Sequence, residues 1–140
     1  MSPDRRNVLQ FASLLSALPL MGAESAAPRI SASIVHQRQA QRNPHEWGDH
    51  FLYFHGTTAN GRTASAGSVW VKPGMEPHPP HRHTEDEFQV IVEGTGEMLL
   101  EDKVTPAGPG TMMYCAGNQL HGVKNTGETP MIIYYCQWQA

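Results

Sequence analysis

Short apolar runs separated by glycine, proline and asparagine most constrain the fold of this 140-residue chain. β-branched and aromatic residues fill these runs, and no helical period follows the N-terminal segment. Strands are expected at residues 51–55, 64–72, 87–92, 97–101, 111–115, 121–125 and 131–138. The strands at 87–92 and 97–101 are expected to form a hairpin, and residues 102–109 a loop. The pattern predicts an all-β fold, and without an internal repeat it predicts a single sandwich or barrel.

A histidine-rich segment near the middle of the chain carries most of the chemistry. His81 and His83 are separated by one residue, so on an extended strand both imidazoles point to the same face. A straight strand would carry Glu87 roughly 13 Å past His83, so residues 84–86 must turn the chain if Glu87 is to join them. The β-branched run after Glu87 indicates a new strand and supports this turn. If the strand ran straight instead, Glu85 would take its place.

A third imidazole is expected from His121, which follows another glycine turn and begins a short strand. Three histidines and one carboxylate would leave about two positions open on a six-coordinate cation. His78, three residues before His81 in a proline-rich stretch, is a rival ligand. We expect it at the rim of the site, where it contacts a substrate.

These residues resemble the first sequence motif of the cupins. That motif reads Gly, His-x-His, Glu, Gly. The matching positions are Gly74, His81, His83, Glu87 and Gly94, with one extra residue in the first spacing.

The second cupin motif is matched at its ends by Gly110, His121 and Asn125. Its middle differs, because residues 115–117 read Cys-Ala-Gly where a proline turn is usual. The resemblance spans roughly residues 67–138. It implies a small double-stranded β-barrel, the cupin or jelly-roll fold, with a metal near its mouth. The implied ligands are His81, His83, Glu87 and His121.

Residues that line the cavity are predicted from strand parity. Gln89 and Ile91 alternate with Glu87, so they are expected to face the same cavity. A buried Gln89 would need a hydrogen-bond partner, which a metal-bound water or a substrate would supply. Tyr114 is a further candidate for the lining.

The N-terminus resembles a bacterial twin-arginine export signal. Arg5 and Arg6 precede an apolar run, residues 8–21, which ends in small residues. The run is short and broken by serines, so a removed signal helix is favoured over a permanent membrane anchor. An ordinary amphipathic helix is the alternative. We therefore expect a signal peptide at 1–27, a polar arm or edge strand at 28–49, the barrel at 50–140, and a periplasmic or secreted protein.

Export would place the two cysteines in an oxidising compartment. Cys115 and Cys136 both fall on late strands and are candidates for a disulfide. Two buried free thiols are the alternative. Cys115 as a metal ligand is a weaker third interpretation.

The functional expectation follows from the site and the charge. A net charge of -3 and scattered basic residues argue against nucleic-acid binding. Mn²⁺ or Fe²⁺ is the favoured cation, with Zn²⁺, Ni²⁺ and Cu²⁺ still open. The resemblance implies action on a small organic acid or hydroxylated compound, by dioxygenase, decarboxylase, isomerase or lyase chemistry. A non-catalytic periplasmic binding or sensing module is the alternative, and a barrel with a vestigial site is a third interpretation. Similarity to cupins also implies a homodimer.

Overall fold

The computed structural model describes residues 27–139, so the expected signal segment lies outside the described residues except for Ala27. Within that range the regular structure is a short 3-10 turn, η1 (Gln37–Gln39), and strands. The strands are β1 (Gln41–His45), β2 (Gly48–Thr57), β3 (Thr63–Val71), β4 (Asp86–Glu93), β5 (Gly96–Leu100), β6 (Lys103–Ala107), β7 (Met112–Cys115), β8 (His121–Asn125) and β9 (Met131–Trp138). No helix in this part of the chain is long and apolar enough to cross a bilayer.

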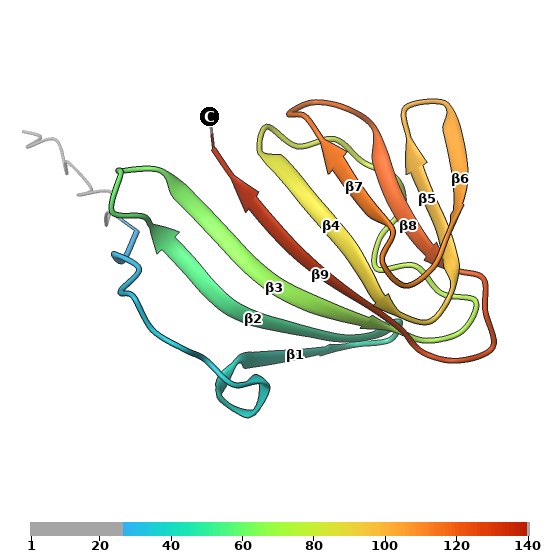
Figure 1. The fold of residues 1–140 in the computed structure, drawn as a ribbon, viewed down its shortest axis with the longest axis horizontal. Helices are drawn as coiled ribbons and strands as arrows, with labels where there is room; N and C mark the ends of the chain where they lie inside the picture. The colour runs from blue at the N-terminus through green and yellow to red at the C-terminus, as the bar shows by residue number, and fades with distance from the viewer. Residues whose placement is uncertain (1–26, 140) are drawn as a thin grey trace, which may run out of the picture.

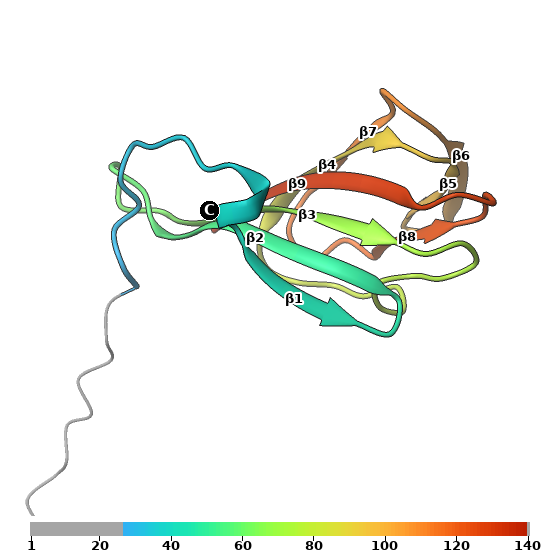
Figure 2. The ribbon, with the colours of Figure 1, turned by 90° about the horizontal axis from the view of Figure 1, so that it is seen from below.

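The strands form two antiparallel sheets. The larger has six strands in the order β1-β2-β3-β9-β4-β7, and the smaller has three in the order β6-β5-β8 (Figure 1). Both views place the smaller sheet at one end of the molecule, beside β4 and β7 (Figure 2). The all-β double-stranded barrel expected from the sequence is confirmed. Because the two sheets stay separate over the described strands, the barrel is open.

The hairpin expected between the strands at 87–92 and 97–101 is wrong. β4 pairs with β7 and β9, whereas β5 pairs with β6 and β8. The chain changes sheets at Gly94, whose φ is 79° and whose added Cβ would lie 2.6 Å from the carbonyl oxygen of Pro130. Strand alternation looks the same for a hairpin and for a crossing between sheets, so the pattern did not distinguish them.

The loop expected at residues 102–109 contains a strand instead. β6 pairs with β5 through a tight turn in which Glu101 has a positive φ of 54°. Pro106 lies within β6, which is an edge strand, where proline is tolerated. The proline and the exposed, polar composition hid this strand.

The cysteines do not form a disulfide, because the structure holds both as free thiols. Cys115 on β7 pairs with Glu87, while Cys136 on β9 pairs with Phe88. Strand β4 therefore separates the two cysteines, and they point to opposite faces of the sheet. Cys115 is buried, but Cys136 is exposed, so the expectation of two buried thiols holds for only one of them.

The core lies between the two sheets. The buried apolar side chains come from both sheets and include Val71, Ile91, Met98, Met113, Val123, Met131 and Ile133. Asn125 is fully buried at the end of β8, where its side chain donates to the carbonyls of Val71 and Thr129. These bonds tie β8 to β3 and to the turn before β9, and so fix the strand that begins with His121.

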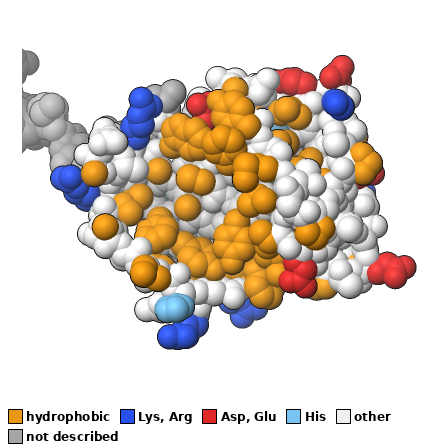
Figure 3. All heavy atoms as spheres, viewed as in Figure 1, with side chains coloured by type: hydrophobic (Ala, Val, Ile, Leu, Met, Phe, Trp, Pro, Cys, Tyr) orange, Lys and Arg blue, Asp and Glu red, His pale blue; other side chains and the backbone are white. Residues whose placement is uncertain are grey.

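The outer face of the six-stranded sheet is strongly apolar. Hydrophobic side chains gather across the middle of this face, with charged side chains at its periphery (Figure 3). The exposed members include Phe88, Met112, Tyr114 and Tyr134. Exposed apolar patches of this kind mark interaction sites. The homodimer stays a prediction.

Candidate metal centre

The proline-rich segment after β3 runs along β8 and fixes His81 opposite His121. The backbone N–H of each donates to the carbonyl of the other at 3.0 Å. Gly122 brings the two segments close, because an added Cβ there would lie 3.3 Å from Pro80. The two imidazole centroids are consequently only 4.6 Å apart.

A bend at residues 84 and 85 carries the chain from His83 back toward the site, as the sequence predicts. The turn between β7 and β8 holds this bend. Asn118 N–H donates to the carbonyl of His83 at 2.6 Å, and Gly117 N–H donates to the carboxylate of Asp86 at 2.8 Å. A Cβ at Gly117 would lie 2.4 Å from the carbonyl oxygen of Thr84. The Cys-Ala-Gly sequence that departs from the cupin pattern therefore still supplies a turn that holds the site.

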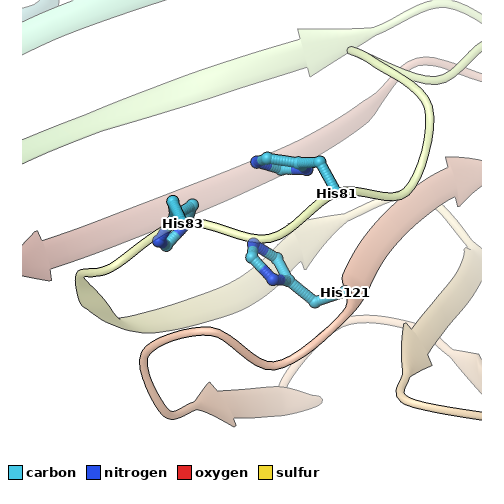
Figure 4. Close-up of side chains that lie close together, drawn as sticks. All are labelled: His81, His83 and His121. Atoms are coloured by element: carbon cyan, nitrogen blue, oxygen red, sulfur yellow. The ribbon is translucent and has the colours of Figure 1, made fainter.

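Three imidazoles face one another in the resulting site. One nitrogen from each of His81, His83 and His121 lies within 4.8 Å of the others. The three rings project from the loop and from the start of β8 into a common space (Figure 4). His78 packs edge-on against His81 but lies outside this cluster.

Backbone carbonyls determine which ring nitrogen is free to bind a metal. Nδ1 of His83 lies 3.0 Å from the carbonyl oxygen of Glu85, and Nδ1 of His121 lies 2.9 Å from that of Gln119. Carbonyl oxygens only accept, so each Nδ1 carries the proton and each Nε2 presents a lone pair in the neutral ring. Metal-binding histidines typically show this arrangement.

Glu87 completes the cluster from β4. Its side chain is 7% exposed, and its Oε2 atom lies 3.3 Å from Nε2 of His83 and 3.2 Å from Nε2 of His121. Gln89 donates to the same oxygen at 3.0 Å. Glu85 lies instead against Nδ1 of His83, on the far side of the ring. Glu87 is thus the carboxylate that faces the free nitrogens, and the straight-strand alternative with Glu85 is not observed.

The donor set fits a divalent cation. Nδ1 of His81 is buried without a hydrogen-bond partner among the described residues, and Nε2 of His121 faces the carboxylate of Glu87, to which it donates a hydrogen bond only when it carries a proton. Two imidazole lone pairs beside a carboxylate oxygen repel one another unless a proton or a cation lies between them. A cation would satisfy all these groups at once.

The charges of the metal-free site are coupled. The hydrogen bond to Glu87 raises the pKa of His121 above its usual value, against the effect of burial. Burial alone would raise the pKa of Glu87, but hydrogen bonds from His121 and Gln89 hold it below the usual value. Burial and the neighbouring imidazoles of His78, His121 and His83 lower the pKa of His81 to about 4. In the metal-free protein, a proton therefore binds at His121 rather than at His81.

Cation binding is expected to release this proton. The raised pKa of His121 stabilises the metal-free fold below pH 6.5, and that contribution is lost as the pH rises through the folded-state pKa. Metal affinity should change in the opposite direction, rising with pH as His121 loses its proton. Calorimetric titration with Mn²⁺ in two buffers of different ionisation enthalpy measures the release. We expect proton release that declines with rising pH, and no release at pH 6.5 would contradict the assignment.

A cavity of about 370 Å³ opens beside the cluster. Of the four lining residues expected from the sequence, His78 lies exposed at its edge and Gln89 lies buried in its wall. The other two expectations are wrong. Ile91 is fully buried in the core because the smaller sheet covers it. Tyr114 is 47% exposed on the outer face of the sheet, since it pairs with Phe88 and not with a cavity residue.

Several residues that sequence reasoning did not assign to the cavity also line it, and four of them carry aromatic or imidazole rings. They are His45, Trp47, His50 and Tyr135. Tyr135 shares strand parity with Ile133 and pairs with Gln89 across β4 and β9. The alternation of side chains along β9 therefore indicated that Tyr135 faces the cavity. That prediction could be made only if the pairing of β9 with β4 was known. His45 and His50 have no ligand spacing in the sequence, and they reach the cavity only because β1 and β2 form one end of the large sheet.

A family model described as the cupin domain matches residues 67–136, so the chain belongs to the cupin family. No curated protein matches the chain.

Among solved structures, the chain is similar to an RmlC-like cupin from Shewanella frigidimarina. The identity is 16%, over 79% of this chain and 93% of that one, with a TM-score of 0.66. It is also similar to KdgF from Halomonas sp., at 19% identity over 76% and 94% of the two chains and a TM-score of 0.63. A predicted oxalate decarboxylase from Thermotoga maritima is 19% identical over 77% and 100%, with a TM-score of 0.62. At these identities the likeness shows the fold alone.

Proposed function

We propose that this cupin binds one divalent cation through His81, His83, His121 and Glu87, and that the cation engages a small molecule in the adjoining cavity. The observation that carries the proposal is the tautomer that backbone carbonyls fix in two of the three histidines. Backbone carbonyls accept from Nδ1 of His83 and His121, so both Nε2 atoms point toward one buried carboxylate. A surface histidine cluster would have no reason to be oriented in this way.

Mn²⁺ or Fe²⁺ is the cation that we propose. The donor set is nitrogen and oxygen, because the Cys115 thiol is directed to the carbonyls of Ala116 and Gln119. Copper, nickel and zinc bind most such sites more tightly than manganese or iron, so the weaker cations need a compartment where the stronger ones are scarce. Folding and metal loading before twin-arginine export would supply that condition. Both the export and the loading order are part of the proposal.

We further propose that the protein is an enzyme for a small hydroxylated compound or organic acid. A bound cation polarises a carbonyl or hydroxyl oxygen and acidifies a bound water. Gln89 holds the carboxylate of Glu87 in place by a hydrogen bond, and the adjoining cavity is large enough for a small metabolite. The similar structures include a predicted oxalate decarboxylase, which is compatible with such a role and does not specify the reaction here.

A turnover screen tests this proposal. Full-length protein loaded with Mn²⁺ or Fe²⁺ is incubated with small hydroxy acids, keto acids and polyols, while oxygen uptake and substrate loss are followed. We expect at least one compound to be consumed, and the His83→Ala variant to be inactive on it. Turnover that is equally fast in the metal-free protein would contradict a metal-dependent enzyme.

A second function is a small-molecule binding or sensing module. It is favoured by one observation: among the described residues that line the cavity, Glu87 is the sole carboxylate and no lysine is present. If Glu87 binds the cation, it is unavailable as a general base. Saturable binding without any product in the same screen would support this module over the enzyme.

A further inference from the structure

The wall of the cavity formed by the large sheet carries polar groups that the metal centre does not use. Gln89 on β4 and Tyr135 on β9 are direct partners across the sheet, and both line the cavity. Paired side chains on one face of a sheet lie side by side. The two residues therefore offer neighbouring hydrogen-bonding groups to whatever occupies the cavity.

Gln89 offers an acceptor. Its Nε2 donates to Oε2 of Glu87, and since a carboxylate only accepts, this bond fixes the orientation of the amide. Oε1 is then the free atom. It is buried, it has no partner among the described residues, and the residue is 9% exposed. A buried carbonyl oxygen without a donor is unfavourable, so a ligand hydroxyl or N–H is expected to pair with it.

Tyr135 offers a donor, because a series of hydrogen bonds that begins on the edge strand β1 fixes the tautomer of its partner, His50. Gln41 Nε2 donates to Oδ1 of Asn43 at 3.1 Å, which turns the Asn43 amide nitrogen toward Nδ1 of His50, 3.4 Å away. Nδ1 of His50 must then accept, and its proton lies on Nε2. Nε2 in turn lies 2.7 Å from the hydroxyl of Tyr135. The hydroxyl therefore accepts from His50 and keeps its own proton, which it can donate to a ligand oxygen in competition with the neighbouring Ser65 side chain.

The ionisation of this pair agrees with the hydrogen-bond directions. Burial, with a smaller effect of His45, lowers the pKa of His50, so its imidazole is neutral and carries a single proton. Burial raises the pKa of Tyr135, so its hydroxyl stays protonated.

Gly67 makes room for this arrangement. It pairs with Tyr135 across β3 and β9. A Cβ at Gly67 would lie 2.8 Å from both Cε1 and the hydroxyl oxygen of the tyrosine. The missing side chain lets the ring lie across β3 and reach His50 on β2.

The charge of the cavity limits its ligand. None of the described residues that line it is a lysine or arginine, and Glu87 is the sole carboxylate. A divalent cation beside one carboxylate leaves a single positive charge, which suits a neutral or singly charged ligand. The parallel rings of His45 and Trp47, 4.7 Å apart, add a flat apolar part to the wall.

We propose that Gln89 and Tyr135 determine ligand specificity: Gln89 accepts a hydrogen bond from a ligand hydroxyl, and Tyr135, positioned by His50, donates one to a second ligand oxygen. The site then takes a small hydroxylated compound with a carbonyl or similar acceptor oxygen and at most one negative charge. This inference rests on the proposed function for the adjoining metal, and it adds the substrate class.

Three matched neutral probes test the proposal. α-Hydroxyacetophenone carries both groups, acetophenone lacks the hydroxyl, and phenethyl alcohol lacks the carbonyl. Dissociation constants are measured by nuclear magnetic resonance, from line broadening with Mn²⁺-loaded full-length protein and from saturation transfer with the metal-free protein. The variants are Tyr135→Phe, Gln89→Met and His50→Leu. Tyr134→Phe, on the opposite face of the same strand, is the control.

The wild type should bind α-hydroxyacetophenone about tenfold more tightly than either relative. Tyr135→Phe should remove the preference for α-hydroxyacetophenone over phenethyl alcohol and keep its preference over acetophenone. His50→Leu should reduce the preference over phenethyl alcohol. Gln89→Met should remove the preference for α-hydroxyacetophenone over acetophenone and keep its preference over phenethyl alcohol. The control Tyr134→Phe should keep both preferences.

The proposal is overturned if no probe binds, if the three bind equally, or if each variant weakens all three alike. Mn²⁺ uptake is measured separately. A protein that takes up no Mn²⁺ contradicts the proposed function, and the same comparison in the metal-free protein then decides this inference.

Discussion

Replacing His83 with alanine is expected to abolish metal-dependent stabilisation of the fold. A cation that binds only the folded state raises the free energy of unfolding by about 2.7 kcal/mol at 100 times its dissociation constant. Loss of outer hydrogen bonds to metal ligands typically weakens affinity by about 10- to 100-fold, so loss of a ligand should weaken it by about 100-fold or more. At the same Mn²⁺ concentration, the variant would then gain about 0.4 kcal/mol or less.

His83 is the best of the three histidines for this test. Its side chain is 20% exposed, whereas that of His121 is 1% exposed, so truncation at His83 leaves the smaller packing defect. His55→Ala is the matched control, because His55 is exposed on β2. His78→Ala tests the rival ligand and should leave most of the Mn²⁺ effect. Chemical denaturation with and without Mn²⁺ measures all three variants, and an unchanged Mn²⁺ effect in His83→Ala would exclude His83 as a ligand.

Replacing Glu87 with glutamine should separate metal binding from folding. The variant removes the negative charge and is expected to weaken Mn²⁺ binding by about 100-fold. The metal-free fold should keep its stability. The new amide oxygen accepts a hydrogen bond from Gln89, and the new amide nitrogen donates one to Nε2 of His83 or His121. At about pH 8, where histidine is ordinarily neutral, the metal-free variant should be within about 1 kcal/mol of the wild type or more stable.

A structural role for Glu87 predicts the reverse. In that case the glutamine variant loses metal-free stability and keeps its affinity for Mn²⁺. Glu85→Gln is the control, since Glu85 lies beside Nδ1 of His83, away from the free nitrogens. It should change neither quantity appreciably.

The sequence predicted the parts of the site that depend on local geometry. The His-x-His spacing and the β-branched run after Glu87 required a bend at residues 84–86, and the structure bends at residues 84 and 85, directly before β4. The position of His121 rested on the cupin resemblance, and the backbone bridge to His81 now explains it. The placement of β9 followed from the proline turn that precedes a strong apolar run, and that of β8 followed from the glycine turn before His121.

The cavity-lining residues that were not predicted from the sequence depend on which strands pair. The role of Tyr135 requires β9 to lie between β3 and β4, with Gly67 on one side and Gln89 on the other. Tyr114 is an aromatic residue of the type that often lines cavities. Its pairing with Phe88 directs its side chain outward instead. Register across distant strands is set by the whole fold, so a local pattern cannot supply it.

The most direct test of the central claim is anomalous diffraction from crystals of the Mn²⁺-loaded protein, recorded at the manganese absorption edge. The account predicts one peak per chain, within coordination distance of one nitrogen from each of His81, His83 and His121 and of one carboxylate oxygen of Glu87. A peak elsewhere, no peak, or a peak that Glu87 does not contact would contradict it.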